Sequence, residues 1–425
     1  MTIKQLHKHF LQCNSVSTDT RKVLKNDMFF ALKGEHFNGN MFAEKALLNG
    51  AKFAVIDEKE FETKNTILVN DVLKTLQELA TFHRALLNIP IIALTGSNGK
   101  TTTKELINVV LTKKYNTTAT FGNLNNHIGV PLTLLSLTND TEIGIIEMGA
   151  NHLKEIVFLC NIAKPDFGYI TNFGKAHLEG FGSIENVIKA KSELYNYLIK
   201  NNEYIFFNAD DRVQKEKLKA YSNKLGFSQN NSEHFNITFL EANPFVKLKI
   251  ENITINSNLI GAYNFTNICA ALLIGTYFNV ESRDLKNAIE NYIPTNNRSQ
   301  VIEKNTNKII LDAYNANPTS MEAALINLAK QGSEYRIAIL GDMFELGKES
   351  EKEHQSILNI TSNLNLDRII LIGENFYKTK NSNPKIKTFS SFEDFKTAFN
   401  FSEIKNATVL IKGSRGMALE RILNL

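Results

Sequence analysis

The sequence predicts an α/β protein of about three domains, and three observations support this prediction. A chain of 425 residues is longer than one ordinary domain. Short apolar runs alternate with helical patterns along most of it, which is typical of parallel sheets covered by helices. This alternation starts near Ile91 and starts again after Asn297, so at least two separate sheets are expected.

The first segment, to about Asn88, has the pattern of a small α/β domain. It contains short apolar runs and a helical stretch from Val72 to Leu87. Pro90 then precedes a new apolar strand, and proline commonly marks such a boundary. We therefore expect a first domain of residues 1–88.

Residues 89–296 are expected to form a central, mostly parallel sheet with antiparallel strands appended. The apolar runs that predict its strands lie at residues 91–94, 143–146, 167–170 and 204–207. One helix is predicted from Ile184 to Leu198. The stretch from Phe235 to Ile260 alternates apolar and polar residues, which favours antiparallel strands.

Residues 297–425 repeat the alternation and are expected to form a second sheet of Rossmann type. Its predicted strands lie at residues 309–311, 337–340, 368–372 and 409–411. A last helix is predicted from Met417 to Leu423. Ligands of such sheets lie at the carboxyl ends of the strands, so polar residues there are candidates for a site.

The composition argues against several classes of protein. The formal net charge of +4 is mild and the lysines are interspersed with carboxylates, so we expect no nucleic acid partner. The N-terminus lacks a leader-like pattern, and no apolar stretch is long enough to cross a membrane. We therefore expect a cytoplasmic monomer without membrane insertion. The three cysteines are far apart in the sequence, which argues against disulfide or zinc frameworks.

The most informative segment is IIALTGSNGKTTTKE, between Ile91 and Glu105. An apolar strand leads into a glycine-rich turn and then into a helical segment, which is the order found in phosphate-binding loops. Glycines let the backbone bring its N–H groups close to an anion, and the helix N-terminus adds a favourable dipole. The residues of this loop are Gly96, Ser97, Asn98, Gly99, Lys100, Thr101 and Thr102.

Within this loop Lys100 would reach the outer phosphates, and a threonine hydroxyl would hold Mg²⁺. The strict P-loop pattern needs a glycine five residues before Gly99, where this chain has Leu94, so the loop is a shortened relative. A plain connection with a solvated Lys100 is the alternative. The order of strand, turn and helix disfavours that alternative, and nucleotide binding is our working hypothesis.

Two further residues are expected at the same edge of the sheet. Glu147 follows the predicted strand 143–146 and is a natural Mg²⁺ ligand, although without the loop a solvated carboxylate would be the simpler interpretation. His177 follows the predicted strand 167–170 and would reach the same edge. A lone histidine is usually structural, so both roles stay open for His177 on physical grounds.

Other polar residues have simple structural interpretations. Lys191 would ordinarily lie on a solvated helix, and nothing in its spacing marks it out. Asn264 and Asn267 open a helix after Gly261, where asparagine is a favoured cap. Asp312 ends a predicted strand of the last domain, where a ligand of such a sheet lies, and turn chemistry is the alternative there.

Together these motifs resemble the Mur ligases, three-domain ATP-dependent enzymes that add amino acids to UDP-N-acetylmuramic acid. The resemblance rests on TGSNGKTT, EMG at Glu147, TNFGKAHLE, AKSE and GAYNFTN. Three more stretches, FGNLNNHIGVPLTLL, DAYNANPTSM and LGDMFELG, resemble the family member that joins D-alanyl-D-alanine to UDP-N-acetylmuramoyl-tripeptide. The resemblance implies a UDP-sugar-binding domain (1–88), an ATP-binding domain (89–296) and a Rossmann-like domain (297–425).

The resemblance also implies roles for the matching residues. Lys100, His177 and Lys191 would be catalytic, and Lys191 would be carbamylated by CO₂ so that its new carboxylate bridges toward a second Mg²⁺. The implied ATP contacts are the loop Gly96–Thr102, Asn264, Arg298 and Asp312. The implied Mg²⁺ ligands are Glu147, His177 and Lys191, beside Thr101 of the loop. The implied contacts to the UDP-sugar are Thr18, Asp19, Thr20, Arg21, Asn125 and Asn126.

The chain departs from the family pattern at three places. Thr20 replaces the serine of the usual DSR and keeps the hydroxyl, Tyr263 replaces the histidine of the usual His-Asn, and Lys175 replaces a glutamate often found before Ala-His. The alternatives are another Mur ligase, a folylpolyglutamate-synthase-like ligase or, in a different class, a P-loop phosphotransferase. The NNHIGVP and YNANP stretches argue against the first two. A non-catalytic nucleotide-binding module is disfavoured because Glu147, His177 and Lys191 are all present.

Overall fold

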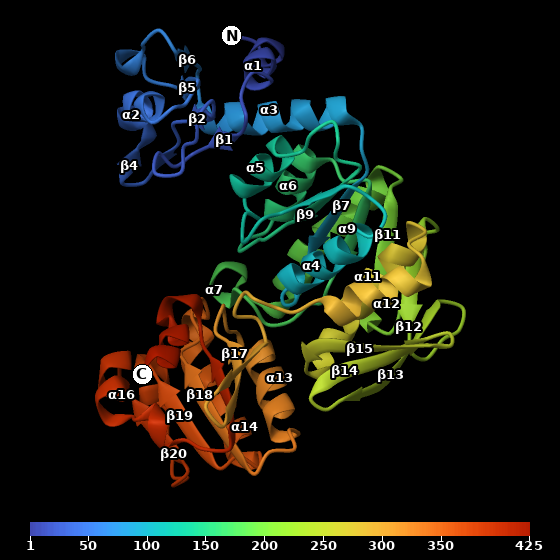
Figure 1. The fold of residues 1–425 in the computed structure, drawn as a ribbon, viewed down its shortest axis with the longest axis vertical. Coiled ribbons are helices and arrows are strands. Elements are labelled where there is room, and N and C mark those ends of the chain that lie inside the picture. The colour runs from blue at the N-terminus through green and yellow to red at the C-terminus, as the bar shows by residue number, and fades with distance from the viewer.

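The structure is a computed structural model that describes every residue from Met1 to Leu425. Figure 1 shows three regions in chain order, from an N-terminal sheet at the top through a large central region to a C-terminal sheet at the lower left. The main sheets have four, nine and six strands, and each lies within one of the three predicted ranges. The predicted α/β class is confirmed, and the domain boundaries at residues 88 and 296 stay predictions.

The N-terminal sheet is parallel throughout, with the strand order β1-β2-β5-β6. Its strands are β1 (Val16–Ser17), β2 (Met28–Phe30), β5 (Phe53–Ile56) and β6 (Thr66–Leu68). A separate hairpin is formed by β3 (Lys33–Gly34) and β4 (Phe37–Asn38). The helices of this region are α1 (Ile3–Phe10), α2 (Ala43–Leu48) and α3 (Val72–Leu87).

Helix α3 joins the N-terminal region to the central one and extends to the right from the N-terminal sheet, above α5, in Figure 1. Asp71 caps its start by accepting a hydrogen bond from the backbone N–H of Lys74 (2.8 Å), and Asn88 follows its end in the left-handed conformation. Its buried residues recur at three- and four-residue spacing. They pack against α1, α5 and α6, so the helix predicted at these residues is confirmed and belongs to an interface.

The central sheet has the order β15-β14-β13-β12-β11-β10-β7-β9-β8. The pairs from β8 to β13 are parallel and the pairs β13–β14 and β14–β15 are antiparallel, so the predicted mixed sheet is confirmed. Its strands are β7 (Ile91–Thr95), β8 (Thr117–Ala119), β9 (Ile143–Glu147), β10 (Phe167–Ile170), β11 (Tyr204–Asn208), β12 (Lys224–Ser228), β13 (Phe235–Ala242), β14 (Phe245–Ile250) and β15 (Ile253–Ile260).

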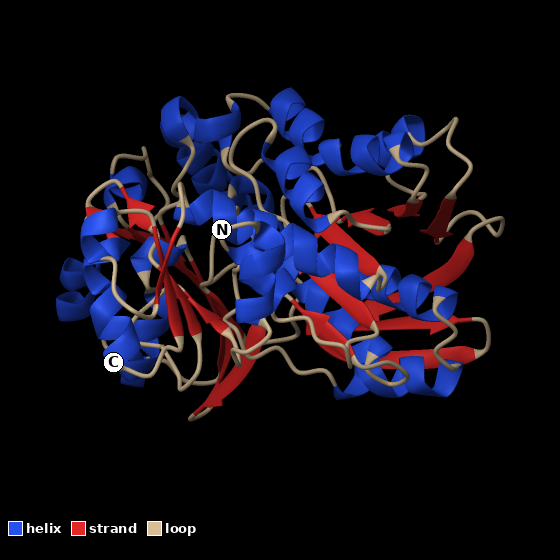
Figure 2. Ribbon diagram, turned by 90° about the horizontal axis from the view of Figure 1, so that it is seen from above, coloured by secondary structure: helices blue, strands red, loops and turns tan.

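Helices cover both faces of this sheet, as the view of Figure 2 shows. They are α4 (Lys100–Leu111), α5 (Gly129–Leu135), α6 (Glu155–Ala163), α7 (Leu178–Phe181), α8 (Ile184–Lys191), α9 (Glu193–Lys200), α10 (Arg212–Lys217), α11 (Phe265–Tyr277) and α12 (Ser282–Asn291). Because both faces are covered, β7 and β9 are buried along their whole length, and their sequences are continuously apolar up to their last residues, Thr95 and Glu147.

The order of the central sheet reverses at β7. This strand pairs with β9 on one side and with β10 on the other, both in parallel. The crevice outside the carboxyl ends of the strands at such a reversal is where ligands of open α/β sheets bind. Thr95, Glu147 and Ile170 end these three strands, so the segments that follow them meet at one edge.

The C-terminal sheet has the order β16-β17-β21-β18-β19-β20, and only its edge strand β16 is antiparallel. Its strands are β16 (Gln300–Lys304), β17 (Asn307–Asp312), β18 (Tyr335–Gly341), β19 (Arg368–Ile372), β20 (Ile386–Phe389) and β21 (Ala407–Lys412). Its helices are α13 (Pro318–Ala329), α14 (Ser350–Asn363), α15 (Glu374–Tyr377) and α16 (Phe392–Ala398). This arrangement agrees with the predicted Rossmann-like sheet.

Two helix predictions need correction. The helix predicted from Ile184 to Leu198 is divided into α8 and α9 at Ser192, whose hydroxyl donates to the Ile188 carbonyl (2.6 Å), a local bond that competes with regular helix geometry. The helix predicted from Met417 to Leu423 is wrong. These residues form 3₁₀ turns, because Ala418 adopts the left-handed conformation (φ 47°) and interrupts any continuous α-helix.

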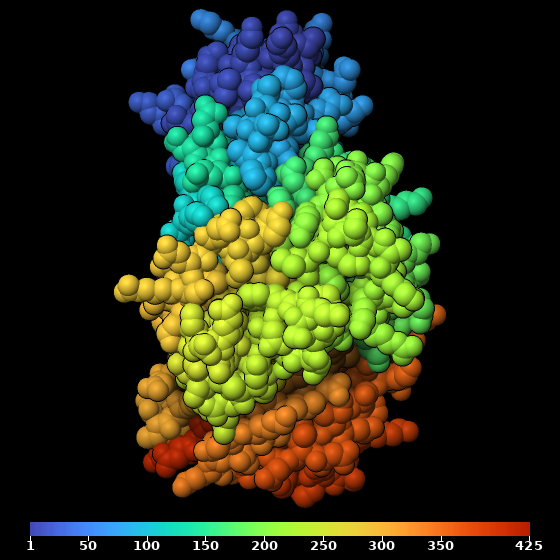
Figure 3. Space-filling model, turned by 90° about the vertical axis from the view of Figure 1, so that its right-hand side faces the viewer, coloured from blue at the N-terminus to red at the C-terminus, as the bar shows by residue number.

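The three regions pack into one molecule. The largest apolar core contains residues from all three sheets, and Figure 3 shows the regions stacked in chain order with the antiparallel strands of the central sheet lying on the C-terminal region. Lys308 lies over the ring of Phe245 at this contact (5.4 Å). No helix is both long and apolar enough to cross a membrane. All three cysteines are free thiols.

Candidate active site

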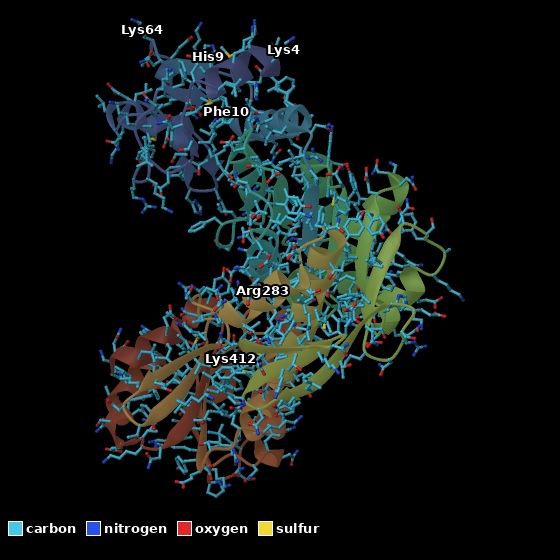
Figure 4. All side chains as sticks on the ribbon, turned by 45° about the vertical axis from the view of Figure 1, so that its right-hand side comes forward. Lys4, His9, Phe10, Lys64, Arg283 and Lys412 are labelled. Atoms are coloured by element: carbon cyan, nitrogen blue, oxygen red, sulfur yellow. The ribbon has the colours of Figure 1, made fainter.

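A cavity of about 850 Å³ lies between the central and C-terminal regions. Its central wall is formed by the segments that follow β7, β9 and β10, as the strand order predicts. Its C-terminal wall is formed by the segments around β17 and the end of β21, and Lys412 lies where the two regions meet (Figure 4). The predicted residues that line it are Ser97–Thr102, Asn125, Asn126, Glu147, His177, Asn264, Arg298 and Asp312.

The glycine-rich turn has the backbone geometry that its sequence predicts. Gly96 and Gly99 have φ values of 147° and 79°. A side chain at Gly96 would collide with the hydroxyl of Thr171, and one at Gly99 with the amide of Asn267, at 1.9 and 2.6 Å. Helix α4 starts directly after Gly99, so its first backbone N–H groups face the cavity as a site for an anion.

Lys100 lies folded against its own loop. Its ammonium group donates to the Gly96 carbonyl (2.8 Å) and lies 3.4 Å from the Ser97 carbonyl. Burial lowers the pKa of this amine, while the carboxylates of Glu147 and Glu345 oppose that shift. The side chain is therefore already in place beside the position that the helix offers to phosphate oxygens.

The segment after β10 braces this loop. The hydroxyl of Ser97 donates to the Gly174 carbonyl (2.7 Å), and the backbone N–H of Asn98 donates to the side-chain oxygen of Asn172 (3.1 Å). The hydroxyl of Thr171 donates to the Asn98 carbonyl (2.6 Å). These bonds hold the loop open without a ligand, which reduces the entropy that binding would cost.

Glu147 is the residue whose environment most clearly requires a ligand. The residue is 1% exposed, one carboxylate oxygen accepts from the Asn125 amide (2.7 Å), and the other is buried without any hydrogen-bond partner. A buried unpaired carboxylate oxygen is costly. A hard divalent cation would satisfy it, and Mg²⁺ in proteins commonly takes one or two carboxylates and completes its shell with phosphates and water.

The rest of the predicted Mg²⁺ set does not form a cluster of side chains. No group of three or more His, Cys, Asp or Glu side chains in the structure is suited to a metal. Nδ1 of His177 lies 2.6 Å from the Glu345 carboxylate of the C-terminal region, and this contact lowers the pKa of Glu345. Phosphate oxygens would therefore have to supply most of the ligands of a cation held by Glu147.

Lys191 lies behind the cavity wall, and the interpretation of it as a solvated helix lysine is wrong. Its side chain is fully buried, and its amine donates to the Ala150 carbonyl (3.1 Å) and lies 5.3 Å from the ring centre of Phe181. Burial, followed by the charge of Lys100, lowers the pKa of Lys191 well below its usual value. The amine is therefore biased toward its neutral, nucleophilic form.

On the C-terminal wall each of the two predicted ATP contacts already has a partner from its own region. Asp312 accepts from Lys412 (2.6 Å) across the adjacent strands β17 and β21, and Lys412 is 2% exposed on its side chain. The guanidinium of Arg298 stacks on the ring of Tyr314 at 3.6 Å, and its Nε is buried without a hydrogen-bond partner. Arg298 is therefore oriented by Tyr314 while retaining a free donor.

Asn264 lines the cavity but is already engaged. Its amide group donates to the Ile260 carbonyl (2.8 Å), and its oxygen accepts from the Asn267 amide (2.9 Å). The oxygen of Asn267 in turn accepts from the hydroxyl of Thr103 on helix α4 (3.1 Å). This network links the start of α11 to the loop helix, and the adenine contact of Asn264 stays a prediction.

The predicted UDP-sugar residues fall into two groups. Asn125 and Asn126 line the cavity. The others, Thr18 to Arg21, lie in the N-terminal region after β1 and are not part of the cavity wall. Asp19 and Arg21 form an ion pair there (2.8 Å), and its hydrogen bonds lower the pKa of Asp19 to about 2. A substrate contacting both groups would have to extend from the N-terminal sheet to the central loop.

Several polar groups lie at the junction of the two walls, and residue patterns alone missed Glu345, Glu353 and Lys412 among them. Asn317 donates to the side-chain oxygen of Asn98 (2.7 Å), and Lys175 forms an ion pair with the buried Glu353 (2.7 Å). Glu345 and Lys412 belong to this set as well. Lys412 could have been found from its position at the end of a predicted strand, whereas no local pattern marks Glu345 or Glu353.

Comparisons with known proteins agree with this geometry. Three family models match successive parts of the chain: "Mur ligase family, catalytic domain" at residues 12–90, "Mur ligase middle domain" at 94–275 and "Mur ligase, glutamate ligase domain" at 297–415. The UDP-N-acetylmuramoyl-tripeptide–D-alanyl-D-alanine ligase of Bacillus subtilis is 34% identical over 96% of this chain and 92% of its own length.

Solved structures give the same result. MurF from Acinetobacter baumannii matches with a TM-score of 0.86 at 28% identity, covering 100% of this chain and 98% of its own. The MurF ligase of Thermotoga maritima, solved in complex with ADP, matches with a TM-score of 0.83 at 27% identity over 98% and 97%. The chain therefore belongs to the Mur ligase family, and within that family to the MurF branch.

Proposed function

We propose that this chain is an ATP-dependent ligase that joins D-alanyl-D-alanine to UDP-N-acetylmuramoyl-tripeptide in peptidoglycan precursor synthesis. The observation that carries the proposal is the meeting of the Gly96–Thr102 loop and the unpaired carboxylate oxygen of Glu147 at one sheet edge. The name of the Bacillus subtilis relative states this reaction, and the Thermotoga maritima structure holds ADP. The reaction would take place in the cytoplasm, where ATP is supplied, on a monomer.

The chemical problem is activation of a carboxylate. An amide does not form from a carboxylate and an amine in water, because the carboxylate is a poor electrophile. In the first step an oxygen of the tripeptide's terminal carboxylate attacks the γ-phosphorus of ATP, the bond to the bridging oxygen breaks, and ADP leaves. The product is an acyl phosphate, in which phosphate is a good leaving group.

The central wall would stabilise this transfer. The N–H groups at the start of α4 and the ammonium group of Lys100 would bind the phosphate oxygens on which charge develops. Glu147 and Thr101 would hold Mg²⁺ together with phosphate oxygens, and Mg²⁺ neutralises charge on the transferred group. His177 would have to leave its contact with Glu345 to join them. Arg298, oriented by Tyr314, would add a cation from the opposite wall.

In the second step the free amine of D-alanyl-D-alanine attacks the activated carbonyl carbon. The tetrahedral intermediate collapses with cleavage of the bond to the phosphate oxygen, phosphate leaves, and the amine loses its proton. Water would hydrolyse the acyl phosphate, so the C-terminal region must keep the cavity closed during this step. The Asn98–Asn317 and Lys175–Glu353 contacts between the two walls are suited to that role.

Lys191 would act after modification. Its neutral amine adds to the carbon of CO₂, an N–C bond forms, and a proton is lost, which leaves a carbamate. The low pKa of this buried amine favours the addition. The resulting carboxylate, beside the Ala150 carbonyl that the amine contacts, would supply an oxygen ligand for a second Mg²⁺.

The test is ADP release by the purified protein with ATP and Mg²⁺. We expect turnover only when both UDP-N-acetylmuramoyl-tripeptide and D-alanyl-D-alanine are present, with the pentapeptide product identified by mass spectrometry. A P-loop phosphotransferase would instead release ADP without an added amine. Amine-independent turnover without a ligated product would therefore exclude the ligase and favour that second class.

A further inference from the structure

The chain passes once from the central to the C-terminal region, between the end of α12 at Asn291 and the start of β16 at Gln300. This crossing segment, residues 292–299, leaves helix α12, which packs against the loop helix α4. It therefore starts beside the element that carries the phosphate-binding residues. Its own residue Arg298 lines the cavity.

The first half of the crossing segment is held by one side chain of the loop helix. Glu105 lies five residues after Lys100 on α4. Its carboxylate accepts from the hydroxyl of Tyr292 and from the amide of Asn296, whose nitrogen lies 2.9 and 3.1 Å from the two oxygens. Lys104 lies 3.8 Å from the same carboxylate. Charge-assisted hydrogen bonds of this kind are stronger than neutral ones.

The second half of the segment is held by the C-terminal region. The backbone N–H of Ser299 donates to Asp312 (3.1 Å), and the carbonyl of Asn297 accepts from the backbone N–H of Tyr314 (3.2 Å). Asn297 and Ser299 both have positive φ values, 56° and 54°, which are uncommon outside glycine. The hydroxyl of Ser299 also lies 2.8 Å from the hydroxyl of Tyr263 in the central region, so the change from central to C-terminal partners takes place across Asn297–Ser299, within strained backbone.

We propose that Glu105 is a positioning residue that anchors the interdomain hinge to the nucleotide-loop helix, so that the C-terminal region closes about Asn297–Ser299. Under the proposed function, on which this inference rests, closure protects the acyl phosphate and brings Arg298 to the phosphates. The bonds from Glu105 to Tyr292 and Asn296 fix the position of the hinge relative to Lys100. Glu105 itself touches neither ATP nor either substrate; it acts through Tyr292 and Asn296.

A purely structural role would be the simpler alternative, and the two make different predictions. If Glu105 only stabilises the fold, its loss lowers the melting temperature and the folded fraction, and turnover per folded molecule stays constant. If it sets the hinge, the nucleotide still binds to α4, but the opposite wall is misplaced. Misplacement by about 1 Å can cost about 10²-fold in rate.

The experiment compares Glu105→Gln, Tyr292→Phe and Asn296→Ala with the wild type and with Glu241→Gln as a control. Glu241 is an exposed carboxylate of β13 that lies 3.5 Å from Lys247 and makes no hydrogen bond to the crossing segment. For each protein we would measure the melting temperature, the dissociation constant of a non-hydrolysable ATP analogue, kcat and KM for ligation, and phosphate release without D-alanyl-D-alanine.

We expect the three hinge variants to bind the analogue within about twofold of wild type, while kcat for ligation falls at least tenfold. Phosphate release without ligation should rise as a share of total turnover, because an imperfectly closed cavity admits water. Glu241→Gln should match wild type in every measurement. A double variant, Glu105→Gln with Tyr292→Phe, should lose no more than the larger single loss, since both act through one contact.

The proposal is overturned if kcat per folded molecule stays within twofold of wild type in all three hinge variants. In that case any loss of total activity would only reflect a smaller folded fraction. It is also overturned if the variants lose analogue affinity in proportion to kcat, since the anchor would then serve the loop rather than the hinge. A wild type that binds the analogue but does not ligate would instead refute the proposed function, so the two failures are distinguishable.

Discussion

The two walls of the cavity are built differently. The central wall has polar groups that lack hydrogen-bond partners within the protein. One carboxylate oxygen of Glu147 has no donor, and the first N–H groups of α4 have no partner within the helix. The C-terminal wall has most of its charges paired, with Asp312 on Lys412 and Glu345 against His177. Unsatisfied polar groups gain the most free energy when a ligand bonds to them. Paired charges are already satisfied, so their wall contributes to the reaction mainly by being correctly placed.

This difference separates binding from closure. Removing a group from the central wall should abolish the chemical step, since the ligand would lose a direct partner. Apart from Arg298, whose cation would contact the phosphates, removing a group from the C-terminal wall should act through the position or stability of that region. The variants below test this division.

The largest effect is expected for Lys100→Ala. This change removes the cation beside the loop carbonyls, and loss of one preorganised stabilising group typically costs about 10²–10³-fold in kcat. Steady-state ADP release with both substrates measures it. Lys113→Ala, an exposed lysine just beyond α4, is the matched control and should be unchanged. Turnover of Lys100→Ala within twofold of wild type would contradict the assignment of the central wall.

Lys191→Ala should lose about 10²-fold in turnover, because the fully buried amine cannot be replaced by solvent. If the role of Lys191 is to carry a carbamate, added short carboxylates should restore part of the rate. Lys189→Ala on the same helix, an exposed position, should show neither loss nor rescue. Full activity of Lys191→Ala without additives would refute the carbamate role.

Asp312→Ala should reduce turnover at least about tenfold by misplacing the C-terminal wall. It leaves Lys412 buried without its carboxylate, which should lower the free energy of unfolding by about 3 kcal/mol. Adding Lys412→Met should recover stability but not turnover, and denaturant unfolding with parallel ligation assays separates the two effects. We would abandon the coupling of Asp312 to closure if the single variant kept both ATP affinity and turnover.

The smallest effect is expected away from both walls, where the N-terminal region meets the central one. His7 and His83 lie 3.1 Å apart there, and His83 contacts the Leu137 carbonyl (2.9 Å). Burial lowers the pKa of both, and in His7 the charge of His83 adds to the shift. The native pair therefore binds fewer protons than the unfolded chain, so stability should fall as the pH drops below about 6.5.

Urea unfolding at pH 7.5 and 5.5 measures this dependence. The double variant His7→Gln with His83→Gln should show a shallower loss of stability between the two pH values, because it carries neither titrating group. Its ligation rate at pH 7.5 should change little, since the pair lies outside the cavity. An unchanged pH dependence in the double variant would contradict the role of this pair in acid destabilisation.

Local patterns predicted the central wall well because its parts are contiguous. The loop from Gly96 to Thr102 combines a strand end, two glycines and a helix start, each with a conformational requirement that the residue types reveal. Glu147 was found for a similar reason, since it ends a strand that any apolar run of this kind predicts. Both predictions needed only neighbours along the chain.

Other predictions failed because the deciding contact was absent from the local sequence. The division between α8 and α9 is the exception, because the Ser192 hydroxyl bonds to Ile188 only four residues away and helical composition did not reveal that bond. The environment of Lys191 depends on Ala150 and Phe181, which precede it by many residues and reach it only through the fold. A lysine on a helix has the same local pattern whether it is solvated or buried, so composition could not decide between them.

The amino-acid sequence alone therefore determined the class of fold and the phosphate-binding turn, because these follow from apolar periodicity and from backbone preferences. The family followed from the resemblance of several motifs in order. Only the folded chain decided which charges are paired, as in Asp312 with Lys412 and Lys175 with Glu353, and that Glu105 holds the crossing segment. The physical reason is that pairing and burial depend on distances in space between residues of separate elements.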